Sequence, residues 1–407
     1  MPTLLAHRVD SHLFVGVKIV ILHQHFKVPA RGGAIRSWYL ASAAVEAGHT
    51  VTVLSGHNGD YKIEIVNGIE VHWLPVAYDN RFDFKDRSRS FLRYVWQVIR
   101  RPALYRGAEL CYAISVPLTT GLAAMWIRKR YGIPYIFEVG DLWPDAPVEM
   151  GFIRNRWLKS FLYALEKRIY SKALSVVALS EPIRAAVEKK TRNKAIEVIP
   201  NMADTDYYSP SARDTALPGE FGLEGKFVVS YVGALGYANG LDYLLKCAAI
   251  CQSRKPQVMF VICGDGAEWE ELQASARKAE LHNVKFIPFQ NREGVRKILN
   301  VTDAVFISYR PVAILETGSP NKYFDGLSAG KLIILNFSGW IRDEIERETC
   351  GVYVDPLNPE TFAERIAPYL NDSAMLRRSQ NNARLLAERK YSRRELSRRF
   401  VERVLKF

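Results

Sequence analysis

Cysteine is scarce in this sequence and follows no pattern typical of a disulfide framework or a zinc site. The 407 residues include five cysteines, an odd number without Cys-x-x-Cys spacing, which favours a reducing compartment. They are Cys111, Cys247, Cys251, Cys263 and Cys350. Cys247 and Cys251 are one helical turn apart, but no histidine pair accompanies them, so buried thiols are favoured over half of a metal site. We therefore predict no metal.

Long hydrophobic runs are also absent. The stretch from Leu13 to Leu22 is interrupted by Lys18 and is far shorter than a bilayer span. No Ala-x-Ala cleavage pattern follows it. The stretch therefore predicts a strand rather than an anchor, and we predict nothing for residues 1–11.

Negative charge is in deficit, with 43 Asp and Glu against 56 Lys and Arg and a net charge of +13. Such a balance favours polyanionic partners. Zinc-finger and RNA-recognition motifs are missing, and the basic clusters alternate with large apolar residues, which favours lipid over nucleic acid. We expect a cytoplasmic protein that lies peripherally on the inner face of the membrane and binds no nucleic acid.

Short β-branched runs alternate with amphipathic segments along the whole chain, which predicts parallel sheets wrapped by helices. The predicted strands are Lys18–Leu22, Thr50–Ser55, Glu109–Ile114, Pro134–Val139, Leu174–Leu179, Phe227–Val232, Val258–Cys263, Val284–Ile287, Ala304–Ser308, Leu332–Leu335 and Val352–Val354. A polar, proline-rich segment after Ile199 divides the series into two. The predicted fold class is α/β, with two doubly wound Rossmann-like domains (17–205 and 206–385) facing each other across a cleft. A C-terminal helix (386–407) packs back toward the first domain.

Open parallel sheets bind ligands at the carboxyl ends of their strands, so the loops there are the candidate site. In the first domain, Gly32-Gly33 lets backbone N–H groups approach an anion at a helix start, although a flexible turn without a ligand is an equal alternative. Asp141 follows another strand and, on a loop stiffened by Trp143 and Pro144, suits proton handling. Glu138, earlier in that strand, equally suits pairing within the fold.

The second domain has two further loops of this kind. Gly233, Ala234 and Leu235 begin a glycine-rich loop whose amides suit a diphosphate, whereas turn chemistry explains Gly264-Asp265-Gly266 better. Ser319-Pro320-Asn321-Lys322 opens a helix on which Lys322 and Asp325 lie three residues apart and can face the cleft together. An ordinary helix start with an internal salt bridge is the alternative. We reject Asp204-Thr205-Asp206 as a metal site because turn capping explains these residues better.

Taken together, these motifs resemble glycosyltransferase family 4, the retaining enzymes of GT-B fold. The resemblance covers nearly the whole chain and is carried by Gly32-Gly33, Ala47-Gly48-His49-Thr50, Val198-Ile199-Pro200-Asn201, Gly264-Asp265-Gly266 and Asp303-Ala304-Val305-Phe306. The strings beginning at Asp141 and Ser319 are similar to the subgroup that builds bacterial surface polysaccharides from amino or deoxy sugars. Asp325 matches the second glutamate of the family's E-x7-E motif. Thr317, beside Glu316, stands where the first is expected, and Asn239 replaces a lysine.

The resemblance implies a nucleotide-sugar donor, held mainly by the second domain without a metal or other cofactor. The donor is expected to be UDP-linked, with an N-acetylated amino sugar, and the acceptor a polyprenyl-diphosphate-linked saccharide of O-antigen or capsule synthesis. The expected catalytic residues are Asp141, Glu316 and Lys322. The expected donor-binding residues are Gly32, Gly33, Gly233, Ala234, Leu235, Phe289, Gln290, Arg310, Ser319, Pro320, Asn321, Lys322 and Asp325. A catalytically silent sugar-nucleotide-binding subunit and an epimerase of the same fold are the alternatives.

A basic, amphipathic segment predicts where the membrane is contacted. Between Arg81 and Arg106 there are eight Arg or Lys against two Asp. One helical face is formed by Phe91, Leu92, Val95, Trp96, Val98 and Ile99, and the opposite face by Arg93, Gln97, Arg100 and Arg101. The apolar face either lies in the lipid interface or packs on the domain's own sheet.

Overall fold

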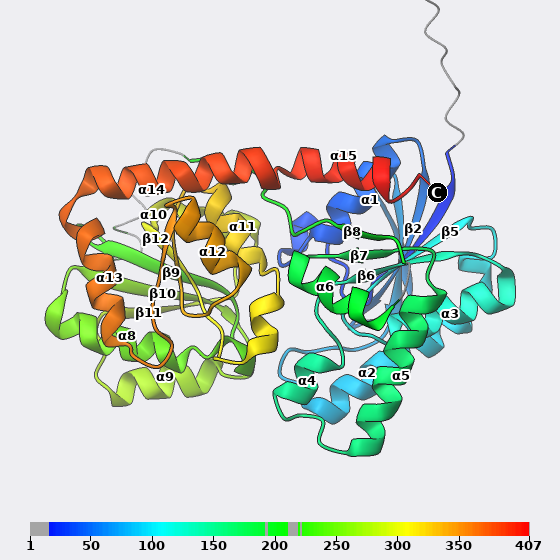
Figure 1. Cartoon of the computed structure of the whole chain (residues 1–407), viewed down its shortest axis with the longest axis horizontal. Helices are drawn as coiled ribbons and strands as arrows, with labels where there is room; N and C mark the ends of the chain where they lie inside the picture. Colours follow the sequence, from blue (N-terminus) through cyan, green and yellow to red (C-terminus); the bar gives the residue numbers. More distant parts are fainter. Residues whose placement is uncertain (1–15, 192–193, 211–218, 220–221, 407) are drawn as a thin grey trace, which may run out of the picture.

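The computed structural model describes residues 16–191, 194–210, 219 and 222–406 and places them in two α/β lobes (Figure 1). The first lobe contains an eight-stranded sheet in the order β3-β4-β2-β1-β5-β6-β7-β8, in which only β3 is antiparallel to its neighbour. Its strands are β1 (Lys18–Leu22), β2 (Thr50–His57), β3 (Lys62–Val66), β4 (Ile69–Pro75), β5 (Leu110–Ile114), β6 (Tyr135–Val139), β7 (Val176–Ala178) and β8 (Ile196–Val198).

The second lobe contains a parallel six-stranded sheet in the order β11-β10-β9-β12-β13-β14. Its strands are β9 (Phe227–Ala234), β10 (Val258–Asp265), β11 (Val284–Pro288), β12 (Ala304–Ile307), β13 (Leu332–Leu335) and β14 (Gly351–Tyr353). The predicted architecture of two parallel-sheet α/β units is therefore confirmed. The antiparallel hairpin of β3 and β4 was not predicted.

Helices cover both faces of each sheet (Figure 1). Those of the first lobe are η1 (Pro29–Arg31), α1 (Arg36–Glu46), α2 (Phe84–Ile99), η2 (Pro102–Leu104), α3 (Thr120–Tyr131), α4 (Asp145–Glu149), α5 (Arg156–Lys172) and α6 (Glu181–Lys190). Those of the second lobe are η3 (Tyr237–Asn239), α8 (Asp242–Arg254), α9 (Trp269–Lys278), α10 (Arg292–Val301), η4 (Ala313–Thr317), α11 (Asn321–Ser328), α12 (Trp340–Arg347), α13 (Glu360–Asn371) and α14 (Ser373–Leu386).

The central strands are buried on both faces, as their unbroken apolar sequences require. In β1, Ile19 and Ile21 pack into one core and Val20 and Leu22 into the other, because successive side chains of a strand point to opposite faces. Side-chain caps fix several helix starts: Asn155, for example, accepts hydrogen bonds from the first N–H groups of α5. The loops between strands and helices are thus held at defined positions.

Two chain segments that cross between the lobes lie side by side. Ala203 N–H donates to Tyr391 O (2.8 Å), and Arg393 N–H donates to Ala203 O (2.9 Å). After α14 the chain passes through η5 (Ala387–Tyr391) into α15 (Arg393–Arg403), which packs against α1. Figure 1 shows α14 over the second sheet and α15 over the first, along the same edge of the molecule.

The predicted amphipathic helix exists as α2, but its apolar residues do not form one outward face. Phe91, Val95 and Val98 are buried against the first lobe, whereas Leu92 and Trp96 are 59% and 53% exposed. Gln97, predicted on the opposite, polar face, is buried as well. Of the two alternatives for this face, packing on the domain's own sheet holds for Phe91, Val95 and Val98, as is usual for a helix of an α/β domain, while Leu92 and Trp96 remain exposed.

Candidate functional site

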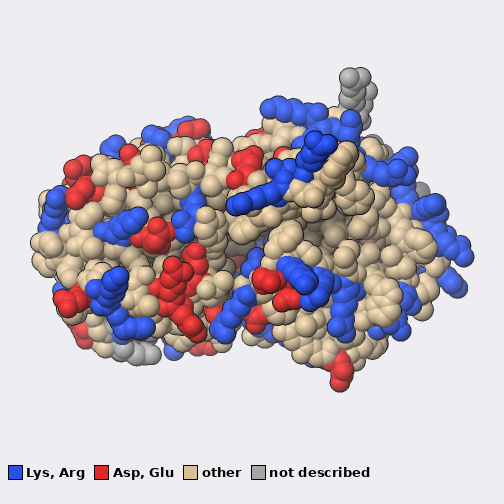
Figure 2. Space-filling view, turned by 90° about the horizontal axis from the view of Figure 1, so that it is seen from below, with Lys and Arg blue, Asp and Glu red and all other residues tan. Residues whose placement is uncertain are grey.

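Loops that follow strands of both sheets meet where the two lobes approach each other, and Figure 2 shows a hollow there. The glycine pair of the first lobe contacts the second directly. A Cβ on Gly32 would lie 3.1 Å from Asn291 Cα and 3.2 Å from the Phe289 ring. Gly32 and Gly33 have φ of +66° and +80°, conformations that favour glycine. The structure therefore brings together Gly32 and Phe289, two predicted donor-binding residues from opposite lobes.

Phe289 and Gln290 follow β11. The Phe289 side chain is 54% exposed, so its ring is open to a ligand. The Gln290 side-chain amide donates to Pro288 O (3.1 Å), which fixes the turn. An exposed ring beside a fixed amide is suited to stacking on a planar base and hydrogen-bonding its edge.

Lys322 lies on the first turn of α11 and extends over the glycine loop that follows β9. Its Nζ is 4.7 Å from the Tyr231 ring centroid and 5.9 Å from that of Tyr309. A Cβ on Gly233 would lie 3.1 Å from Lys322 Cε, and the φ of Gly233 (+154°) is a conformation that favours glycine. Burial lowers the pKa of Lys322 to about 8, and Asp325 partly opposes the shift. This amine can hold an anion at the loop and titrates near neutral pH.

Asp325 lies one turn further along α11. Burial raises its pKa to about 7, the carboxylate of Asp204 adds to the shift, and Arg292 and Lys322 oppose it. Asp325, rather than Glu316, is the carboxylate that acts on the pKa of Lys322. A carboxylate of this kind can accept hydrogen bonds from ribose hydroxyls when ionised.

Asp141 follows β6 and comes near the second lobe. Burial raises the pKa of its carboxyl group, and its charge in turn adds to the raised pKa of Tyr309, which follows β12. Tyr309 is held by a hydrogen bond from its backbone N–H to Asn336 Oδ1 (3.0 Å) and by packing on Phe337. Tyr309, which was not predicted, is therefore close to both predicted residues: it feels the charge of Asp141, and its ring centroid is 5.9 Å from Lys322 Nζ.

Several predicted donor-binding residues have structural partners instead. Ser319 and Pro320 are buried; Asn201 N–H donates to Ser319 Oγ (3.3 Å), and the Asn201 amide donates to Ser319 O. Ser319 thus joins the two lobes through Asn201. Pro320 is the N-cap of α11, and no described side chain caps the helix; Tyr323 N–H donates to Pro320 O (3.0 Å), which leaves the N–H groups of Asn321 and Lys322 at the helix start.

Arg310 and Glu316 also pack against neighbouring loops. Arg310 Nε donates to Tyr237 O (2.8 Å), its guanidinium stacks on the Tyr237 ring, and it pairs with Asp242 (3.3 Å). Arg310 therefore fixes η3, beside the glycine loop. Glu316 lies in η4 and packs against Gly339: a Cβ built on Gly339 would lie 3.1 Å from the Cβ of Glu316. Ala234 and Leu235 continue the glycine-rich loop that begins at Gly233. Leu235 N–H donates a backbone hydrogen bond to Asp265 O.

Glu138 has a structural role, as its strand position allowed. It forms a bidentate ion pair with Arg36 (3.0 Å for each contact) and accepts a hydrogen bond from Tyr112. Arg36 also donates to the carbonyls of Ile199 and Pro200, where the chain leaves the first lobe. This buried pair therefore anchors the interlobe segment to the first sheet.

Asp204 joins both lobes and α15 through its carboxylate. It accepts hydrogen bonds from Tyr39 (2.6 Å), Arg292 (2.7 Å) and Arg393 (3.2 Å). Asp206 pairs with Arg393 at 3.0 Å. Both carboxylates therefore pair with arginine side chains of this protein. No group of three or more His, Cys, Asp or Glu side chains suited to a metal occurs within the described ranges. Sequence reasoning could not find this junction, because its members are far apart in the chain.

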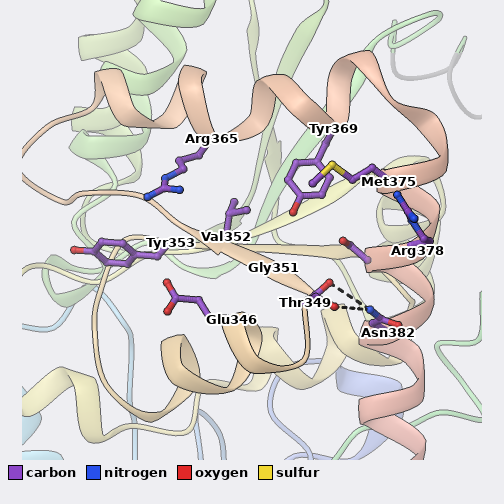
Figure 3. Close-up of a pocket in the computed structure, with 11 residues that line it drawn as sticks. Glu346, Thr349, Gly351, Val352, Tyr353, Arg365, Tyr369, Met375, Arg378 and Asn382 are labelled. Carbon is purple, nitrogen blue, oxygen red and sulfur yellow. Dashed lines mark hydrogen bonds between the residues drawn. The ribbon is translucent and has the colours of Figure 1, made fainter.

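A separate hollow of about 490 Å³ lies at the outer edge of the second sheet, beside β14 (Figure 3). Arg365 and Tyr369 of α13 line one side and Glu346 of α12 the other, while Asn382 donates to Thr349 Oγ1 (2.8 Å). None of its lining residues belongs to the predicted site.

The fold places two parallel-sheet α/β lobes on either side of a hollow, as in a two-domain enzyme. Comparison with known families identifies the class: the model for glycosyl transferases group 1 matches residues 215–386, and the model for the glycosyl transferase 4-like domain matches residues 31–202. The chain therefore belongs to the GT-B glycosyltransferases of the family-4 type, enzymes that use nucleotide sugars as donors. The predicted family and fold are confirmed.

Individual relatives agree with this assignment. The chain is 25% identical over 271 residues to the uncharacterised glycosyltransferase YqgM of Bacillus subtilis (strain 168), covering 65% of this chain and 69% of the relative. It is 24% identical over 236 residues to an alpha-D-kanosaminyltransferase of Streptomyces kanamyceticus, covering 56% and 59%. Among solved structures, Anabaena Alr3699/HepE in complex with UDP-glucose superposes with a TM-score of 0.73 at 18% identity, covering 96% and 100% of the two chains.

Proposed function

We propose that this glycosyltransferase moves an N-acetylated amino sugar from a UDP donor to a polyprenyl-diphosphate-linked saccharide, with retention of anomeric configuration, during synthesis of a bacterial surface polysaccharide. The observation that carries the proposal is the convergence of Lys322, Asp325 and Tyr309 from the second lobe with Asp141 from the first. The UDP-glucose complex of the structural relative supports a UDP donor, and the name of the alpha-D-kanosaminyltransferase supports an amino sugar.

Donor binding follows from the second lobe's loops. The base stacks on Phe289 beside the Gln290 amide, the ribose hydroxyls donate to Asp325, and the diphosphate accepts from Lys322 and from the amides that begin at Gly233. One ammonium group and several N–H dipoles stabilise the negative charge that develops on the leaving diphosphate. No metal is required for this arrangement.

Transfer occurs between the lobes. Asp141 orients the acceptor hydroxyl or takes its proton, for which a raised pKa is an advantage near neutral pH. Gly32 lies against Phe289, and this contact between the lobes limits the access of water to one side of the site.

The test is an incubation of the enzyme with a panel of UDP-sugars, with and without a polyprenyl-diphosphate-linked saccharide, analysed by mass spectrometry. We expect an acceptor heavier by one sugar residue only when donor and acceptor are both present. An isomerised donor formed without acceptor would instead identify an epimerase. UDP binding without any product across the panel would overturn the proposed reaction.

A further inference from the structure

The N-terminal half of α5 is held along one side and exposed on the other. None of the residues from Arg156 to Leu165 is fully buried, although Tyr163 lies beside Lys190 and Leu165 packs on the core of the first lobe. The second half is attached more firmly, because Glu166, Ile169 and Tyr170 are buried and Glu166 pairs with Lys190 (2.8 Å). A helix exposed in this way would normally carry polar side chains on its free face.

The free face carries aromatic rings instead. Trp157 is 71% exposed and Phe161 is 64% exposed, and the two are one turn apart. Continuing along the same face by helical spacing leads to Arg168 and Lys172, on the side opposite Glu166. The stripe is therefore aromatic at its first end and cationic at its last, with no acidic residue on it.

A groove beside this stripe has the same character. It has a volume of about 450 Å³ and lies between α3 and α5. Three apolar and four basic side chains line it, and none is acidic. They are Leu122, Met125, Trp126, Arg128, Lys129, Arg168 and Lys172. An apolar floor rimmed by cations complements a molecule with an anionic head and a hydrocarbon body.

The surface begins beside the hollow between the lobes. Phe152, 49% exposed, lies just before α5 and contacts Tyr237 of η3 at a ring-centroid distance of 5.8 Å. In Figure 1, α2, α4 and α5 lie together at the lower end of the first lobe. Figure 2 views the molecule from that end; much of the first lobe's surface there is uncharged, with more Lys and Arg than Asp and Glu around it. A lipid-linked substrate held there would have its saccharide near the hollow.

We propose that the outer faces of α5 and α3 bind the surface of an anionic lipid bilayer, with Trp157 and Phe161 entering the interface and the basic residues of the groove contacting lipid phosphates. This inference rests on the proposed lipid-linked acceptor, and it assigns the contact to α5 and α3 rather than to the apolar face of α2. Arg156 stacks on Trp157 at 4.6 Å, which places a cation at the depth of the headgroups.

The test is flotation of the full chain with vesicles of neutral lipid alone or with added anionic phospholipid, at low and high salt. Trp157→Ser with Phe161→Ser should reduce binding roughly tenfold or more, because two rings no longer leave water. Leu357→Ser with Leu385→Ser is the matched control, since both leucines are exposed on the second lobe. This control should float like the wild-type protein.

Charge is tested separately. Arg168→Gln with Lys172→Gln should weaken binding to anionic vesicles by roughly fivefold per charge and reduce its salt dependence. Arg377→Gln with Arg378→Gln, on the second lobe, should not. Wild-type protein that fails to float with anionic vesicles at low salt, or α5 variants that float normally, would overturn the inference.

Two further measurements separate this inference from the proposed function and from α2. UDP binding, measured by calorimetry, should be unchanged in the α5 variants. If these variants lose flotation but the wild-type protein glycosylates no acceptor, the lipid-binding surface is supported and the proposed function is refuted. Loss of flotation in Leu92→Ser with Trp96→Ser, but not in the α5 variants, would assign the contact to α2 and refute the proposal.

Discussion

The pKa of Lys322 gives a sharp test of donor binding. With a pKa of about 8, roughly nine-tenths of the amine is protonated at pH 7 and roughly one-tenth at pH 9. If the diphosphate requires the protonated amine, affinity for UDP should fall about tenfold across this range. Uridine lacks the diphosphate and should not show this loss. Asp325, with a pKa of about 7, is proposed to bind the ribose that both ligands share, so the ratio of the two affinities isolates Lys322.

Substitution of Lys322 measures, independently of pH, how much its charge contributes to UDP affinity. Lys322→Met keeps the length of the side chain but removes its charge. A hydrogen bond to a charged group contributes about 1.5–3 kcal/mol, so UDP should bind roughly 10- to 150-fold more weakly at pH 7 while uridine is nearly unaffected. The pH dependence of the UDP-to-uridine ratio should also disappear.

The affinities for UDP and uridine are measured by calorimetry at several pH values, with the wild-type protein, Lys322→Met and Lys322→Arg. Lys322→Arg retains a cation at all of these pH values and should recover part of the UDP affinity without the loss at pH 9. Equal losses for UDP and uridine in Lys322→Met would remove Lys322 from the diphosphate. A flat UDP-to-uridine ratio in the wild-type protein would show that the amine does not titrate in this range.

Three further substitutions test the remaining assignments. Asp141→Asn should lower turnover roughly 10²- to 10⁴-fold with UDP affinity unchanged, measured by steady-state kinetics and calorimetry; wild-type turnover would rule out its role. Glu138→Gln should cost about 3–5 kcal/mol in urea unfolding because it leaves the buried Arg36 unpaired, and an unchanged midpoint would contradict the anchoring role. Asp204→Asn should cost about 1.5–3 kcal/mol at pH 7. The pKa of Asp204 is lowered in the folded protein, so this difference should shrink as the pH falls below about 4, whereas a pH-independent difference would exclude the ion pairs as its cause.

Much of the fold followed from hydrophobic patterning, because strands buried on both faces have unbroken apolar sequences. The predicted bounds of β1 and β13 agree with the structure. The hairpin of β3 and β4 was missed, because β3 is an edge strand whose side chains, such as Ile65, are largely exposed. Its Asn67-Gly68 turn, with φ of +50° and +77°, is a sequence pattern that could have revealed it.

The site was predictable only where its residues lie close in the chain. Lys322 and Asp325 share one helix, so their proximity followed from spacing. Arg292 and Tyr309 could not be assigned, because their partners Asp204 and Asp141 come from distant segments that only the docking of the lobes brings near. The face of α2 that packs inward was equally undetermined, since the sequence pattern fits lipid and sheet alike.

The central claim is that this cleft transfers a sugar from a UDP donor to a lipid-linked acceptor with retention of configuration. Proton NMR of the reaction with an active donor and a detergent-solubilised acceptor tests it most directly, because one spectrum follows the anomeric protons of donor and product. We predict that the donor is consumed only when the acceptor is present, and that the new glycosidic bond has the anomeric configuration of the donor. A product of inverted configuration, or consumption of the donor without the acceptor at the same rate, would contradict the account.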